Sequence, residues 1–98
     1  YNISTLQIVI TIYGVLLKTV DDINDTDIDN LHKRIGVNVK KYRELRGITQ
    51  LQLSLAMNLK SPGLISQSEL YTNKQHFNIK HLYQLAYILD CEITDFFE

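Results

Sequence analysis

The 98-residue chain contains few of the residues that form cross-links, bind metals or carry catalysis. Its one cysteine, Cys91, cannot form a disulfide within the chain, which fits a reducing compartment. The three histidines, His32, His76 and His81, lack metal-ligand spacing, and the four glycines are isolated, so no glycine-rich phosphate loop is present. No Ser/His/Asp or Cys/His set can be argued. The sequence therefore predicts no enzyme, metal site, cofactor or small-molecule ligand.

Long hydrophobic runs are also missing. The apolar run near the start is shorter than about 18 residues and includes Gln7 and Lys18, so it predicts no membrane span. No basic residue precedes this run and no small-residue cleavage site follows it, so no signal peptide is predicted either. We expect a cytoplasmic protein.

Net charge is nearly absent, at −1, but it is unevenly distributed. Residues 31–89 hold nine Lys or Arg against Glu44 and Glu69, a formal charge of +7. Residues 1–30 and 90–98 each carry −4. A basic middle between acidic ends could offer a phosphate backbone a positive face, although any helical domain also has solvated charged faces.

The stretch from Thr49 to Tyr71 predicts two short helices joined by a tight turn, with the rest of the chain supporting them. Thr49 is a good N-cap, and Asn58 tolerates the left-handed backbone at a helix end. Ser61 followed by Pro62 is a start signal for the second helix, which should run to about Tyr71. The residues expected to be buried are Leu53, Ala56, Met57 and Leu59 in the first helix, and Ile65 and Leu70 in the second.

The residues around this pair resemble a known family. The segment IGVNVKKYRELRGITQ, residues 35–50, is similar position by position to the opening of the phage-repressor, Cro-like (XRE) helix-turn-helix domains. Ile65, Ser66 and Glu69 match the recognition helix of that family, and LYQLAYILDCEITDFF resembles its last two helices. The resemblance covers about residues 31–98. Two features differ: the turn between the helices is one residue longer, and Ser68 replaces a core aliphatic residue.

The resemblance implies a binding site for double-stranded DNA in the major groove. It implies that Arg43 and Glu69 form a partly buried ion pair that orients the recognition helix. Gln67 is then the side chain best able to read a base, since its amide can bond adenine bidentately. The expected DNA contacts are Gln50, Lys60, Ser61, Pro62, Gly63, Ser66, Gln67, Asn73 and Lys74.

The first 20 residues lie outside the resemblance, and their periodicity fits a strand or a helix, with the strand favoured. Because this segment is too apolar to remain in water, we expect it either to fold onto its own domain or to join a homodimer. The last helix of the family is a rival dimer surface. The expected dimer residues are Leu6, Ile8, Ile10, Ile12 and Leu45 from the first option, and Phe96 and Phe97 from the second.

The remaining chain predicts three further helices. A long one should begin at the N-cap Thr26, bury a seam that starts at Ile28, and end near Arg46 before Gly47. Another should run from the N-cap Asn78 to Asp90, with Ile79 among its core residues, and Thr94 should cap a last turn. The predicted fold is mainly α: an extension and acidic linker over residues 1–25, and a five-helix, lambda-repressor-like domain over residues 26–98.

These patterns together predict a sequence-specific DNA-binding regulator, a repressor acting as a homodimer. The alternative is a protein-protein interaction module, or an antitoxin-like partner protein, built on a helix-turn-helix core.

Overall fold

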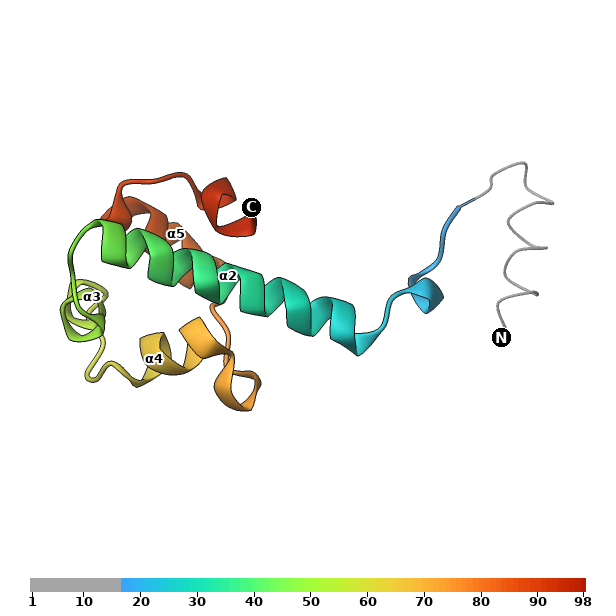
Figure 1. Cartoon of the computed structure of the whole chain (residues 1–98), viewed down its shortest axis with the longest axis horizontal. Coiled ribbons are helices and arrows are strands. Elements are labelled where there is room, and N and C mark those ends of the chain that lie inside the picture. The colour runs from blue at the N-terminus through green and yellow to red at the C-terminus, as the bar shows by residue number, and fades with distance from the viewer. Residues whose placement is uncertain (1–16) are drawn as a thin grey trace.

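The computed structural model describes residues 17–98, and within them the chain is helical (Figure 1). Residues 17–98 contain four α-helices and three short 3₁₀ helices. In chain order these are η1 (Val20–Asp22), α2 (Asp25–Leu45), α3 (Gln50–Ala56), α4 (Gly63–Leu70), η2 (Thr72–Lys74), α5 (Ile79–Leu89) and η3 (Ile93–Phe97).

The long helix α2 begins two residues before the predicted start. Asn24, not Thr26, is its N-cap: its side chain accepts from the Asp27 backbone N–H at 3.0 Å, and Asp27 accepts in return from the Asn24 N–H at 3.1 Å. This reciprocal capping box satisfies two backbone donors at once. The helix ends as predicted before Gly47, whose φ of +68° suits a residue without Cβ.

One face of α2 carries the core and the contact with α4. Ile35, Gly36, Val39 and Arg43 are buried, whereas Ile28, predicted to open the buried seam, is exposed. Figure 1 shows the reason: the first turns of α2 extend past the other helices of the described part of the chain, so none of those helices covers them.

Helix α3 has the predicted cap. The Thr49 hydroxyl accepts from the Gln52 N–H at 3.0 Å, and the Gln52 side chain accepts from the Thr49 N–H at 2.8 Å. Leu53 and Met57 enter the core, while Ala56, predicted to be buried, is exposed. Asn58 follows with φ of +59°, so the left-handed helix end expected there is present.

Helix α4 crosses α2 and buries Ile65 as predicted. Leu70 is 70% exposed instead of buried, because the helix ends there and Tyr71 turns the chain into a left-handed conformation with φ of +57°. The segment after α4, predicted as a loop, is partly helical. It contains η2, and Asn73 and Lys74 also have positive φ.

The C-terminal part completes the core. Asn78 caps α5 as predicted, accepting from the His81 N–H at 2.8 Å, and Leu82, Leu85 and Leu89 are buried. Ile79, expected in the core, is 72% exposed because it lies in the first turn on the outer side. Core packing ends at Phe96 in η3.

The described residues are mainly helical, as predicted, but they form four α-helices instead of five and no strand. The last helical element is the five-residue 3₁₀ helix η3, preceded by Glu92 at the N-cap position and not by Thr94. No strand occurs within residues 17–98, and the end of the predicted extension, Leu17–Thr19, has no regular structure. Residues 1–16 of that extension lie outside the described residues. In the part of the chain that is described, no helix is both long and apolar enough to cross a membrane.

Candidate nucleic-acid interface

A buried polar network fixes α4 relative to α2 and α3. Arg43 in α2 donates from Nε to Oε2 of Glu69 in α4 at 2.8 Å and from Nη2 to Oε1 at 3.0 Å. The remaining Arg43 nitrogen, Nη1, donates to the Ile48 carbonyl at 3.1 Å. Gln50 in α3 adds a fourth bond, from Nε2 to Glu69 Oε1 at 2.9 Å. The network therefore joins three helices and the turn between two of them.

The two charged groups of this network are nearly removed from solvent, since both residues are buried. The hydrogen bond to Glu69 is the main cause that raises the pKa of Arg43 above its ordinary value, against the opposing effect of burial. A desolvated ion pair adds little net stability but is costly to break from one side. Its structural effect here is to hold α4 in one orientation.

The close approach of α2 and α4 depends on small residues. Gly36 in α2 lies beneath the backbone of Ser68 and Glu69 in α4. Ser68, where an aliphatic residue is usual in the resembling family, is buried, and its hydroxyl has no hydrogen-bond partner among the described residues. Because Gly36 has no side chain, the backbone of α4 can lie directly against that of α2.

The start of α4 is the part of the helix pair left outside the core. Lys60 and Ser61 in the preceding turn are exposed, and Pro62 and Gly63 are partly exposed. The helix starts one residue later than Ser61 and Pro62 predicted: Pro62 is at the N-cap position and the helix has no side-chain cap, although Ser61 Oγ accepts from the Gly63 N–H at 3.5 Å. Lys60 supplies a positive charge to the polar front that these four residues form, and within residues 17–98 it has no ion-pair partner.

Two predicted contact residues on α4 differ in availability. Gln67 is exposed one turn into the helix, and its side chain has no hydrogen-bond partner within residues 17–98. The Ser66 hydroxyl instead donates to the Gly63 carbonyl at 3.2 Å within the same helix. The Gln67 side chain is therefore more available for a DNA contact than that of Ser66. A third predicted contact residue, Gln50, donates its amide to Glu69.

The loop after α4 presents Asn73 and Lys74, which are both exposed. An aromatic cluster fixes this loop to α2: the His32 and His76 rings stack at 4.0 Å between centroids, and the Tyr71 hydroxyl donates to Asp29 Oδ1 at 2.7 Å. The sequence analysis found no metal-ligand spacing among the histidines and did not predict this cluster. No local pattern in the sequence relates His32 to His76.

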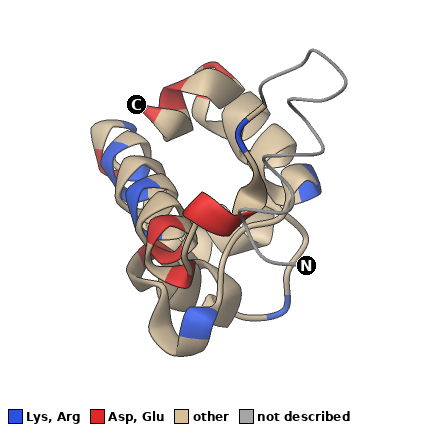
Figure 2. Ribbon diagram, turned by 90° about the vertical axis from the view of Figure 1, so that its right-hand side faces the viewer, with Lys and Arg blue, Asp and Glu red and all other residues tan. Residues whose placement is uncertain are grey.

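Basic residues extend along α2, whereas the acidic ones concentrate in η1, the first turns of α2 and the C-terminal segment (Figure 2). Lys33 and Lys40 lie three residues before and four after Gly36, so they share its face of α2 at the edge of the α4 contact. Both are exposed. Sequence reasoning counted their charge but not their position, which only the Gly36 contact reveals.

The residues predicted to form a dimer interface have different environments. Leu45 is 70% exposed at the end of α2, and Phe97 is 39% exposed. Phe96 lies fully inside the core of its own chain, so its ring is not presented to a second copy. Leu6, Ile8, Ile10 and Ile12 lie outside the described residues.

The described residues contain no cluster of three His, Cys, Asp or Glu arranged to hold a metal ion. In comparisons with known proteins, no family model matches the chain, and no curated protein or solved structure matches it.

Proposed function

We propose that the chain binds double-stranded DNA and regulates transcription as a homodimer, a repressor, with α4 lying in the major groove. The observation that carries this proposal is the start of α4: a polar, partly glycine-lined front ahead of the exposed Gln67, on a helix whose orientation is fixed by a buried ion pair. A preorganised helix loses little freedom on entering a groove, which favours binding.

The supporting charges lie on several sides of this helix. Lys60 precedes it, Lys74 follows it, and Lys33 and Lys40 flank its contact with α2. Lysines in such positions pair with phosphates and hold a protein in register without reading sequence. Sequence preference would come from Gln67, with Pro62 and Gly63 allowing close approach of the backbone to the bases.

The decisive experiment measures binding to a random-sequence duplex across a range of salt concentrations. The logarithm of the association constant should fall linearly with the logarithm of salt concentration, in proportion to the phosphates neutralised. Lys60→Gln and Lys74→Gln should each reduce the slope by about 1, since each removes one phosphate contact. Lys41→Gln, an exposed lysine on another face of α2, is the matched control and should retain the wild-type slope.

The alternative, a protein-interaction module on the same helical core, gives a different result. It predicts no duplex binding at low ionic strength, or binding that does not respond to salt. Absence of duplex binding would reject DNA binding, and binding without salt dependence would reject the proposed lysine–phosphate contacts.

A further inference from the structure

The outward face of α5 carries two large apolar side chains that nothing covers in residues 17–98. Tyr83 and Tyr87 are 73% and 85% exposed, and their spacing of four residues places them on the same face. Ile79, four residues before Tyr83, continues this face. Aromatic side chains are enriched in protein interfaces, where their rings bury much area at low entropic cost.

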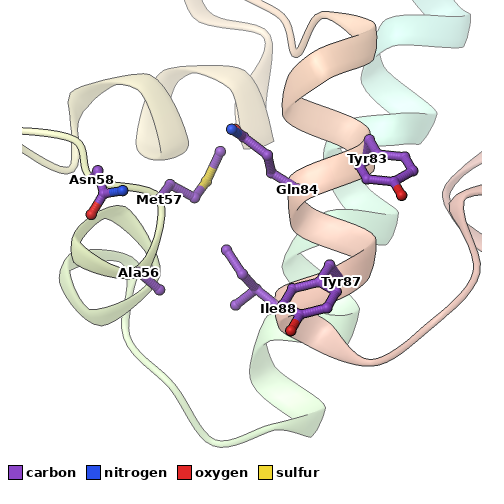
Figure 3. A pocket seen from close by; sticks show the side chains of 7 residues that line it. All are labelled: Ala56, Met57, Asn58, Tyr83, Gln84, Tyr87 and Ile88. Carbon is purple, nitrogen blue, oxygen red and sulfur yellow. The ribbon is translucent and has the colours of Figure 1, made fainter.

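The two tyrosines form a ridge with a hollow on each side. One hollow lies between α5 and the end of α3, where Met57, Gln84 and Ile88 line it (Figure 3). The other lies toward the C-terminal segment, lined by Cys91 and Ile93 among others. In a two-fold interface the same patch of both copies meets, so the tyrosine ridge of one copy can insert into a hollow of the other.

The outward face of α5 has opposite charges at its two ends. Lys80 lies at one end of α5 and Asp90 directly after the other end, and both are exposed. Lys80 and Asp90 are each five residues from Leu85, and the two tyrosines are each two residues from it. When two copies of the helix pack antiparallel about this midpoint, Lys80 faces Asp90 of the second copy and Tyr83 faces Tyr87. A parallel pair would instead bring like charges together.

We infer that a second copy of this chain docks on the outer face of α5, with the two α5 helices antiparallel and centred at residue 85. The helix dipoles are then also opposed, which is favourable. Asp90 contacts Arg46 of its own chain at 3.1 Å, but its side chain is 90% exposed and remains accessible to Lys80 of the other copy. Within residues 17–98, Lys80 has no ion-pair partner of its own.

This inference assigns a surface to the homodimer of the proposed function. None of Lys80, Tyr83, Tyr87 and Asp90 belongs to the set proposed to contact DNA. Dimerisation can therefore be measured without DNA, and its failure is distinguishable from a failure to bind DNA.

The first test is sedimentation equilibrium of the full chain, without DNA, over a wide range of concentrations. The wild type should reach dimer mass, and Tyr87→Glu should raise the dissociation constant about 30-fold or more, as expected for loss of a central tyrosine. Leu45→Glu changes the exposed leucine of the rival interface considered from the sequence, and it should dimerise like the wild type if α5 forms the dimer. Circular dichroism melting establishes that both variants are folded.

A monomeric wild type would overturn the inference. So would a wild-type dissociation constant in Tyr87→Glu, including the case in which removal of residues 1–16 or Leu45→Glu abolishes the dimer instead.

A second test addresses the register. In a Cys91→Ser background, Tyr83→Cys mixed with Tyr87→Cys should oxidise mainly to the mixed disulfide, because these positions face each other in the antiparallel pair. Dominance of either like-with-like product would overturn this register. Lys80→Glu should weaken the dimer, and adding Asp90→Lys should restore it; no restoration would argue against the opposed charges.

Discussion

Gly36 lies against the carbonyl oxygens of Ser68 and Glu69, where α2 and α4 cross. A methyl group on Gly36 would stand 2.5 Å from the Ser68 oxygen and 2.6 Å from the Glu69 oxygen. Both are backbone atoms, so no side-chain rotation can relieve the contact. Space for a methyl group can be made only by moving α4 away from α2, and that movement would also stretch the bonds between Arg43 and Glu69.

Gly36→Ala should therefore destabilise the fold in spite of the better helix propensity of alanine. We expect the free energy of unfolding to fall by about 1–3 kcal/mol, the usual range for overpacking, as measured by urea denaturation. Gly63→Ala is the matched control, since the nearest atom to its added methyl group is Ser61 Oγ at 3.6 Å. A Gly36→Ala protein as stable as this control would contradict the close contact.

Breaking the ion pair from one side should be more costly than removing it altogether. Arg43→Met or Glu69→Met leaves one buried charge without its partner, for an expected loss of about 3–5 kcal/mol in the free energy of unfolding. The double variant leaves no buried charge and should lose much less than the sum of the two. Urea denaturation of all four proteins measures the coupling. Additive losses would show that the two residues act independently.

Gln67→Ala should reduce discrimination between DNA sequences more than it reduces general affinity. Loss of a bidentate contact with adenine costs about 1–3 kcal/mol on the preferred sequence, whereas random duplex is held through phosphates. The measurement compares the affinity of wild type and variant for a duplex selected from a random pool and for random duplex. An equal loss of affinity for both duplexes would show that Gln67 does not read the base sequence.

The histidine cluster predicts a loss of stability in mild acid. Burial, and to a smaller extent the nearby His76, lowers the pKa of His32 below its ordinary value of 6.5, although Asp29 opposes the shift. Burial also lowers the pKa of His81, with a further contribution from Lys80. Just below pH 6.5 the unfolded chain therefore binds more protons than the folded one, so stability is lost as the pH falls through the unfolded pKa toward the lower folded values.

We expect the urea midpoint of the wild type to fall between about pH 7.5 and pH 5.5, a window that spans the ordinary pKa of histidine. His32→Gln removes one contributing group and should show a smaller fall. The difference between the two pH profiles measures the contribution of His32 together with its electrostatic coupling to His76 and Asp29. Identical pH profiles would mean that His32 titrates alike in the folded and unfolded states.

Local signals in the sequence predicted the helix limits well where a cap was unambiguous. Thr49 and Asn78 were correctly predicted as N-caps, and Gly47 as a helix end, because each acts within one turn of the backbone. The prediction of Thr26 was wrong because Asn24 forms the capping box with Asp27, whereas Asp29, three residues after Thr26, accepts from the Tyr71 hydroxyl. Burial was less predictable at helix ends, as Leu70 and Ile79 show, since periodicity does not reveal where neighbouring helices stop.

Contacts between distant residues were predictable only through the family resemblance. It led to the pairing of Arg43 with Glu69, and the structure contains this ion pair. The same resemblance assigned Gln50 to DNA, while the structure shows its amide bonded to Glu69. The stack of His32 on His76 and the exposed tyrosines of α5 depend on tertiary packing, which spacing along one chain does not encode.

The projecting start of α2 has a consequence for local unfolding. The helix is continuous from Asp25 to Leu45, yet Asp25–Asn30 lacks buried residues, and the second half of the helix is buried along one side. Backbone amides near Val39 can exchange with solvent only when the core opens, whereas the first turns need only fray. In native-state hydrogen exchange, the amides in the first turns of α2 should therefore exchange much faster than those in its second half.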